Sequence, residues 1–461
     1  MMAKRIVGFF LGAACVALCA AGPAGAAEQM SIEEAVAEAL RSNPAVTGAD
    51  AEVAASREAL TSARADRLPT LSAGYYWTNH NREPIQKSAW GTFPAGYKEE
   101  AGWDVQLVQP LFSGYALKTA HDLARLGVDT EELNRRETLQ QLALSVRQAC
   151  HRLLLAKRLQ TVAEDEVISL TSHRRVAVVN HDQGLIPLND LLKAEVALAE
   201  AVQNRNLAES ETDKARISVN RLLHRDPFEP LAIADRHAPP IWAQSSAELE
   251  ALAVTRRPLV ALLRLGIRQA TLGETAAKSA YYPRVDLVGR YAKAGDGPIP
   301  DDNVFTHSDS ASITLQASWT LWNWGKTGAN AAEQAQRRRS VQASLADAEA
   351  AVKQDVQNAL LDRAVALKNI TTAEQSRAQA RENWRITRVQ YDQQVATSTD
   401  VIDARTYLTS ADSNYYQALY AYMDALAVLD YATGKPVVRP AAGENSSGMN
   451  GDGYLSAGVG K

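Results

Sequence analysis

The chain has 461 residues, of which 46% are hydrophobic and 22% charged, and its formal net charge is -4. This composition allows a sizeable buried core and excludes the disordered and collagen-like classes, while the net negative charge disfavours a nucleic-acid partner. After the amino terminus no stretch has about 18 consecutive apolar residues, which excludes a polytopic helical membrane protein.

The first 26 residues have the features of a secretory signal peptide. Lys4 and Arg5 precede an apolar run over residues 6–21, and Ala24-Gly25-Ala26 provides a small-x-small cleavage site. We expect cleavage before Ala27 and a mature chain that is exported.

Cysteine usage is consistent with a chain that gains no stability from disulfides. Cys15 and Cys19 lie within the signal, so Cys150 is the single cysteine of the expected mature chain. Stability must then come from packing or assembly. A lipid anchor is the alternative at the amino terminus, but Leu18 breaks the small-residue box that should precede Cys19, and the residues before Cys15 fit only loosely.

An internal duplication organises the mature chain. Residues 181–192 align without gaps on residues 391–402, a shift of 210 positions (391 − 181), and residues 69–71 match residues 283–285 at a shift of 214 (283 − 69). The two shifts differ by four, which indicates that four residues are inserted or deleted in a loop between the two matching segments. One unit therefore occurs twice.

The two repeats are predicted to be joined by a linker and followed by a tail. The first repeat covers residues 27–223 and the second covers residues 246–434. Residues 224–245 contain four prolines and are interpreted as the linker, while residues 435–461 are rich in Gly, Ser and Asn and are predicted to be flexible.

Each repeat begins with a helix. In the first repeat the helix is predicted over residues 31–67, because Ser31 can cap it, Glu34 completes a capping box and Pro69 stops it. The equivalent helix of the second repeat should stop at residues 281–283.

Four segments alternate between apolar and polar residues, strictly so over residues 313–321, and are predicted to be strands at about residues 69–79, 102–112, 283–293 and 311–322. Each is about ten residues long, which is enough to cross an outer membrane at a tilt. A soluble amphipathic sheet is the alternative. It is disfavoured because no other strand-like segment could cover the apolar face, and because aromatic residues gather near the strand ends. We expect a membrane girdle composed of Trp77, Trp103, Trp319, Trp322 and Trp324.

Long helical hairpins follow the strands. Apolar residues recur at heptad-like spacing over residues 139–170 and again over residues 341–370, as in a coiled coil. From residue 113 to about residue 179 there is no proline and little glycine, which predicts a helix on the order of 100 Å long. A turn over residues 181–188 leads into a returning helix over residues 188–223, and the second repeat should turn over residues 391–399.

Four membrane strands cannot close a barrel, and an open edge in hydrocarbon leaves unsatisfied amide groups. Copies of the chain must therefore combine. Two copies would supply eight strands with a filled interior, whereas three would supply twelve strands and a water-filled lumen.

The mature chain resembles the TolC family of outer-membrane efflux and secretion channels. The resemblance lies in residues 109–114 at the strand-to-helix junction, in Gly184-Leu185 with Asp190 at the first turn, and in residues 400–404 after the second. It implies an α+β membrane protein in the outer membrane, extending into the periplasm: a homotrimer with a twelve-stranded β-barrel continued by a twelve-helix α-barrel. It also implies a periplasmic adaptor and an inner-membrane pump or ABC exporter as partners, and no cofactor.

Asp400 and Asp403 lie one helical turn apart, so both carboxylates share a helix face. In a trimer they would form two rings of three carboxylates, and the resemblance gives them the periplasmic pore constriction. The alternative is an ordinary solvated helix start, where aspartate is favoured by the helix dipole.

The resemblance also assigns a gate linkage to Asp190 and Tyr391, although Ala396 stands where the family's usual pattern has an arginine. We therefore expect a gate that is held differently. The adaptor-docking tips implied by the resemblance are Gly184, Leu185, Val395 and Thr397; simple turn chemistry is the alternative for Gly184.

Enzymatic functions are poorly supported. Gly325-Lys326-Thr327 resembles the end of a phosphate loop, but Thr320 stands where that motif needs a glycine, and no histidines have i, i+4 metal-site spacing. We expect no enzyme and no metal site. A periplasmic coiled-coil adaptor or scaffold remains the alternative function, and the sequence does not separate efflux from protein secretion.

Overall fold

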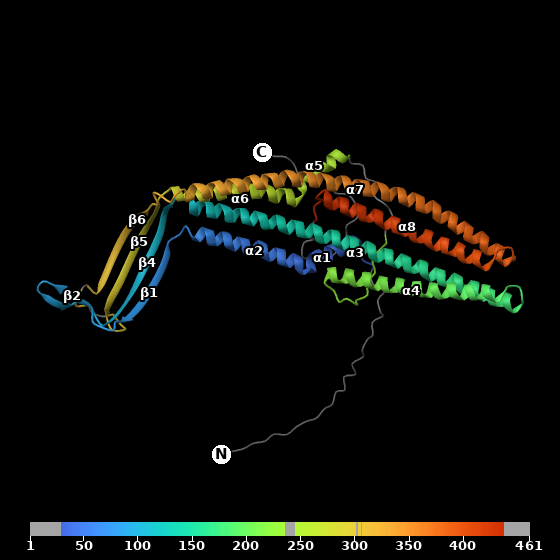
Figure 1. Cartoon of the computed structure of the whole chain (residues 1–461), viewed down its shortest axis with the longest axis horizontal. Coiled ribbons are helices and arrows are strands. Elements are labelled where there is room, and N and C mark those ends of the chain that lie inside the picture. The colour runs from blue at the N-terminus through green and yellow to red at the C-terminus, as the bar shows by residue number, and fades with distance from the viewer. Residues whose placement is uncertain (1–28, 236–244, 301–302, 306, 438–461) are drawn as a thin grey trace, which may run out of the picture.

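The computed structural model describes residues 29–235, 245–300, 303–305 and 307–437. The predicted signal peptide and nearly all of the predicted tail lie outside these residues. Figure 1 shows a long molecule in which a β-sheet occupies one end and long helices run away from it to two adjacent hairpin tips at the other end.

The sheet is antiparallel and has the strand order β1-β4-β5-β6. Its strands are β1 (Thr70–Asn79), β4 (Glu99–Ser113), β5 (Arg284–Asp296) and β6 (Asp309–Ser318). Strands β4 and β5 pair with each other, so the central ladder joins the two repeats. Strands β1 and β6 form the two edges of the sheet.

The two faces of the sheet differ in polarity. Leu71 on β1 and Ile313 and Leu315 on β6 are exposed by 69%, 84% and 65%. The polar positions carry a salt bridge between Asp104 and Arg290, whose Oδ2 and Nε atoms lie 3.5 Å apart. The apolar face therefore has no cover from the described parts of the chain.

Strand β6 is shorter than the sequence predicted. It ends at Ser318, which pairs with Arg284, the first residue of β5. The segment before β5 is a short 3₁₀ turn, Ser279–Tyr281, followed by Pro283, so β6 has no partner strand beyond Ser318. Residues 319–322 accordingly lie outside the strand.

A second hairpin, β2 (Ile85–Ser88) paired with β3 (Gly91–Pro94), extends from the far end of the sheet (Figure 1). No sequence pattern predicted this hairpin. Its strands have only four residues each, too few for an alternating pattern to stand out.

The first predicted helix is in fact two helices, α1 (Ile32–Ser42) and α2 (Pro44–Ala65). The capping box of Ser31 and Glu34 is present as expected. The break falls at Asn43, whose backbone is extended because the ring of the following proline disfavours the helical conformation.

The second repeat breaks in the same way. Its first helices are α5 (Ser246–Arg256) and α6 (Pro258–Lys278), and the residue between them, Arg257, is also extended before a proline.

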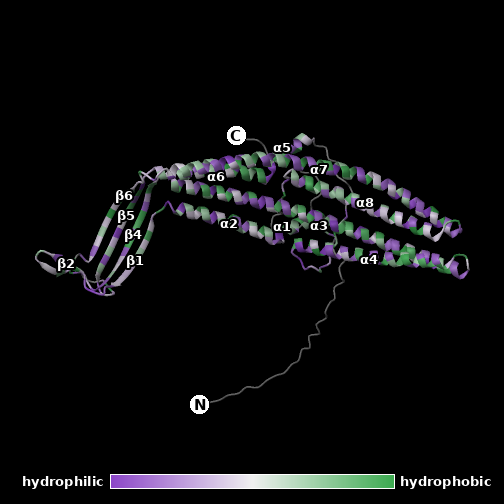
Figure 2. Ribbon diagram, in the orientation of Figure 1, coloured by the Kyte–Doolittle hydropathy of each residue, from purple (hydrophilic) through white to green (hydrophobic). Residues whose placement is uncertain are grey.

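The long hairpins reproduce the duplication. They are α3 (Ala116–Asp182) with α4 (Leu188–Leu223), and α7 (Lys326–Asp392) with α8 (Ser398–Ala432). Helices α3 and α7 have 67 residues each, or about 100 Å at 1.5 Å per residue. Polar and apolar residues intermingle along all four (Figure 2), and none of the described helices combines the length and the hydropathy that a membrane crossing requires.

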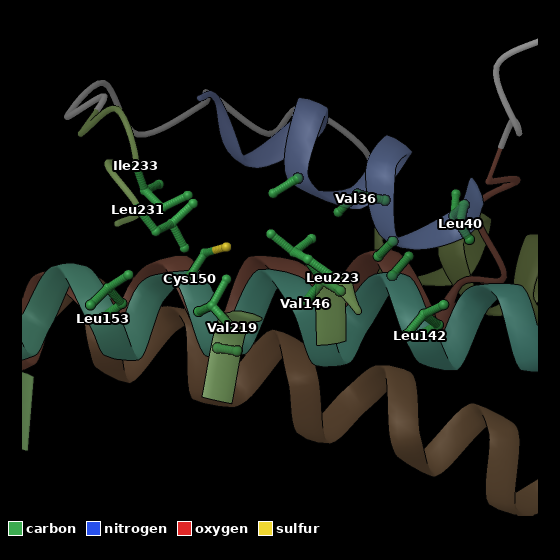
Figure 3. Close-up of a cluster of buried hydrophobic side chains, with 14 of the residues drawn as sticks. Val36, Leu40, Leu142, Val146, Cys150, Leu153, Val219, Leu223, Leu231 and Ile233 are labelled. Carbon is green, nitrogen blue, oxygen red and sulfur yellow. The ribbon is translucent and has the colours of Figure 1, made fainter. Parts of the chain in front are cut away.

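The main core lies midway along α3, where α1, α4 and the start of the linker pack on it (Figure 3). Leu231 and Ile233 of the linker are 8% and 5% exposed, and Met30 forms a parallel bridge with Ile233. Cys150 is fully buried here, and burial raises the pKa of its thiol to about 12. This cysteine therefore fills space in the core.

Candidate gate at the tips of the helical hairpins

The two hairpin turns share one backbone conformation. Each contains a residue in the left-handed region, Gly184 with φ 72° and Gln394 with φ 62°. The turn-closing hydrogen bonds match, at 2.8 Å from Leu185 N to Asn180 O and 2.8 Å from Val395 N to Gln390 O. The duplication therefore extends to the tips.

Apolar side chains project from both turns. Leu185 is 49% exposed and Val395 is 74% exposed, and a Cβ added at Gly184 would meet nothing within 4 Å. The predicted docking residues thus lie on open surface.

Asp400 closes the turn before α8. Its Oδ2 atom accepts hydrogen bonds from Thr397 N at 2.8 Å and from Thr397 Oγ1 at 2.7 Å. The Asp400 N–H donates to Thr397 Oγ1 at 3.3 Å, and this bond completes a capping box with the bond from Thr397 N. These bonds, the backbone one foremost, lower the pKa of Asp400. Asp403 is exposed one turn further along. Both side chains are exposed, but that of Asp400 is also held by the turn.

Asp190 is joined to a lysine that the sequence analysis missed. Lys193 Nζ lies 3.2 Å from Asp190 Oδ1 and 3.3 Å from Thr399 Oγ1, so this ammonium group connects α4 to α8. The contact is exposed to solvent.

Tyr391 is buried, with 5% of its surface exposed, and it does not reach outward. Its ring packs against His173 of α3, with centroids 4.7 Å apart. Burial raises the pKa of Tyr391, so the phenol is neutral.

His173 also contacts α8. Its Nε2 atom lies 2.8 Å from Ser398 Oγ, and the same hydroxyl lies 3.4 Å from the carbonyl oxygen of Asp190. His173 and Ser398 are 6% and 1% exposed, and burial lowers the pKa of His173 to about 4. The imidazole is therefore neutral near pH 7.

A second polar pair lies seven residues away from this contact on each helix. Glu166 of α3 and Arg405 of α8 are 9% and 5% exposed, and the guanidinium of Arg405 lies 5.9 Å from the ring centre of Trp384. Polar residues at heptad spacing within an apolar seam were the available sequence signal for both pairs.

The five tryptophans of the expected membrane girdle form two groups at opposite ends of the sheet. Trp77 and Trp103 lie toward the end distant from the helices, whereas Trp319, Trp322 and Trp324 lie where β6 leads into α7. Trp103 pairs with Lys293 and Ser318 pairs with Arg284, so the groups are separated by about nine residues (293 − 284), or roughly 30 Å.

No group of His, Cys, Asp and Glu side chains in the described ranges is arranged to hold a metal ion. No curated protein matches the chain significantly.

Solved structures share the fold. The chain is similar to the outer-membrane channel CmeC of Campylobacter jejuni, with a TM-score of 0.77 at 13% identity over 89% of this chain and 87% of that one. It is similar to CusC, with a TM-score of 0.75 at 17% identity over 88% and 93%. It is also similar to the outer-membrane protein VceC of Vibrio cholerae, with a TM-score of 0.74 at 15% identity over 87% and 96%.

The sequence itself matches the outer membrane efflux protein family over residues 35–224 and 250–435, which together cover both repeats. The chain therefore belongs to the outer membrane efflux protein family, and it is an exit duct of the outer membrane that extends into the periplasm.

Proposed function

We propose that three copies of this chain form a channel that carries cargo from an inner-membrane pump, through a periplasmic adaptor, to the exterior. The observation that carries the proposal is the open sheet: β1 and β6 are edges, and the apolar face is exposed. In hydrocarbon each unpaired backbone group costs several kcal/mol. Edge-to-edge pairing of three sheets removes the edges and gives twelve strands.

The tryptophan groups support the membrane position. A separation of roughly 30 Å along tilted strands suits the apolar band of an outer-membrane barrel, which is about 25 Å tall. Aromatic side chains at both limits would lie at the level of the lipid headgroups.

We assign the pore constriction to Asp400 and Asp403 with different roles. Asp403 is exposed and would present a ring of three carboxylates to cations, whereas Asp400 fixes the turn that positions this ring. Gly184, Leu185, Val395 and Thr397 would form the surface on which adaptor hairpins dock.

The gate linkage proposed for Asp190 and Tyr391 is indirect. Asp190 acts through Lys193, which reaches Thr399, and Tyr391 acts through His173. These contacts join the hairpins of one protomer without an arginine at position 396.

Outer-membrane fractionation, heat-modifiable migration and planar-bilayer conductance test the proposal. We expect a detergent-dependent trimer that forms pores, with Asp403→Asn reducing the block by multivalent cations. A stable monomer that stays dissolved without detergent would contradict the channel and favour a periplasmic scaffold. The class of inner-membrane pump that co-purifies would separate efflux from protein secretion.

A further inference from the structure

The two edge strands of the sheet, β1 and β6, each have one side without a partner strand in the single chain. We propose that β6 of one copy pairs antiparallel with β1 of the next copy in one particular register, in which Thr314 lies opposite Thr78 of the next copy, and that this pairing extends β6 to residue 323. The inference rests on the proposed function, because it gives the register in which three sheets close into one barrel.

The two repeats build their own hairpins in the same register. Thr70 pairs with Val108 in the first hairpin, and Arg284 pairs with Ser318 in the second. These positions correspond under the duplication, with shifts of 214 (284 − 70) and 210 (318 − 108). The two repeats are therefore equivalent in strand pairing as well as in sequence.

The exit from the second strand is also the same in both repeats. Two consecutive residues in the left-handed region lead into each long helix: Gly114 and Tyr115 before α3, and Trp324 and Gly325 before α7. The shift is again 210 (324 − 114). The equivalence therefore holds at both ends of the segment that joins β6 to α7.

The junction between the repeats inside one chain is a template for the junction between chains. A ring of three chains contains six repeats, and the second strand of each repeat meets the first strand of the next. Within the chain this junction is the ladder between β4 and β5, in which Asp104 pairs with Ala292. The two shifts convert this pair to Thr314 (104 + 210) and Thr78 (292 − 214). Equivalent packing of all six repeats therefore gives the register between copies.

This register brings like faces of the two strands together. Leu315 lies opposite Trp77 of the next copy, and Gln316 lies opposite Tyr76. Leu315 and Trp77 are 65% and 51% exposed in the single chain, so the pairing gives both a cross-strand neighbour. A slip by one residue would place the apolar residues of β6 beside the polar residues of β1. The competing registers are therefore those displaced by two residues.

The pairing also accounts for the early end of β6. Within the chain β6 stops at Ser318, because its partner β5 begins at Arg284. The matching strand β4 continues to Ser113 because β5 accompanies it that far. Residues 319–323 are the equivalents of residues 109–113, and the first residues of β1 in the next copy would accompany them. The alternating sequence pattern up to residue 322 then describes the strand of the assembled barrel.

Disulfide cross-linking of the full-length protein tests the register. Four double variants combine Thr314→Cys or Gln316→Cys with Tyr76→Cys or Thr78→Cys. The pairs 314/78 and 316/76 are in register, whereas 314/76 and 316/78 are displaced by two residues on the same face. Opposite Cα atoms lie about 4.5–5.5 Å apart and can be joined by a disulfide, whereas diagonal ones lie about 7–8 Å apart and cannot.

We expect both in-register variants to run mostly as covalent trimers on non-reducing denaturing gels, and the displaced variants to do so at least several-fold less. Residues 314 and 78 of one chain lie on opposite edges of the sheet, roughly 14 Å apart, so they cannot form a bond within the chain. Cys150 is fully buried and does not interfere. The four single-cysteine variants are the controls and should assemble without covalent trimers.

Hydrogen exchange gives a second readout that needs no substitution. Among residues 319–323, the amides that face the next copy should exchange roughly tenfold or more slowly in the trimer than in the detergent-dissociated monomer. The amides of β4 are the internal control, because both neighbouring strands belong to the same chain.

The outcomes separate the two proposals. Wild-type protein that forms no trimer would overturn the duct, and the register with it. Trimers that cross-link best through a displaced pair, through all four pairs equally or through none would overturn the register alone. Equal exchange of residues 319–323 in trimer and monomer would overturn the extension of β6.

Discussion

Gln394 occupies a backbone position that suits glycine better. Its φ of 62° lies in the left-handed region, where the matching turn of the first repeat has Gly184. An ordinary side chain pays about 1 kcal/mol or more for this conformation. The sequence alignment paired these two residues, but only the structure shows that both are left-handed and that one of them is strained.

Placing glycine at position 394 and glutamine at position 184 should stabilise the second turn and destabilise the first. We expect Gln394→Gly to stabilise the second turn by about 1 kcal/mol and Gly184→Gln to destabilise the first by a similar amount. Hydrogen exchange of the amides at residues 391–398 and 181–188 would measure both. Faster exchange in the second turn after Gln394→Gly would contradict the assignment of strain.

His173 should make the contact between the two hairpins sensitive to acid, because its Nε2 atom lies 2.8 Å from Ser398 Oγ. Burial holds its pKa at about 4, below the ordinary value of 6.5, although the nearby Asp392 on α7 acts in the opposite direction. Between these pH values the His173 imidazole binds more protons when the hairpins are separated and hydrated than when they are in contact. Closure is therefore fully favoured above pH 6.5 and loses about 3 kcal/mol as the pH falls to 4.

Conductance should accordingly rise below about pH 6 in the wild type and stay flatter in His173→Gln. The comparison controls for the carboxylates near the pore mouth, because both proteins contain all of them. Identical pH profiles would remove His173 from the acid response.

At the scale of elements, periodicity predicted the long helices well. The exact ends of the helices and strands depend on neighbouring residues and on paired strands. The returning helix over residues 188–223 has the expected bounds, because Pro187 and the left-handed His224 terminate it locally. The break at Asn43 was missed because the apolar pattern continues across Pro44. The end of β6 could not be predicted, since it depends on where β5 begins.

The candidate site shows the same limit. Turn residues such as Gly184 and Thr397 can be predicted from the sequence, because glycine and threonine are favoured in turns and at helix starts. His173 and Lys193 do not, because their roles depend on partners more than 200 positions away. A polar residue at a heptad position indicates that it lies in a helix interface, but the spacing does not identify the residue that it contacts on the other helix.

Gly114 at the junction of β4 and α3 should tolerate no side chain. Its φ is 59°, and an added Cβ would lie 2.4 Å from the carbonyl oxygen of Ser279 in the other repeat. We expect Gly114→Ala to cost about 2–3 kcal/mol, because the strained conformation and the backbone collision add. Gly127→Ala in α3 is the matched control, since a Cβ added there would meet nothing within 4 Å. We expect this substitution to stabilise the folded protein by up to about 1 kcal/mol, because alanine favours a helix more than glycine does.

The temperature at which the trimer dissociates on gels would rank these two variants. A Gly114→Ala trimer as heat-resistant as the wild type would show that the junction can relax.

At the scale of the whole molecule, the sheet is the part that the single chain leaves incomplete. Both repeats contribute one central strand and one edge strand, so the duplication alone creates a curved four-stranded segment but no closed surface. The helices have cores of their own, around Cys150 and where α5, α6, α7 and α8 meet. In the proposed assembly, neighbouring copies would complete the sheet at its edges and lipid would cover its apolar face.

The two faces of β6 offer a direct test of that dependence. Ile313 lies in the middle of the strand, is 84% exposed and points to the apolar face, whereas the adjacent Thr314 points to the polar face. If the apolar face contacts hydrocarbon, Ile313→Arg should cost about 2–4 kcal/mol and sharply reduce the trimer in the outer-membrane fraction. Thr314→Arg adds the same charge one residue away, toward the water-filled lumen, and should assemble normally with altered ion selectivity. Equal assembly of both variants would place the apolar face in water, and equal loss would place both faces in packed protein, so either result would contradict a lipid-facing barrel.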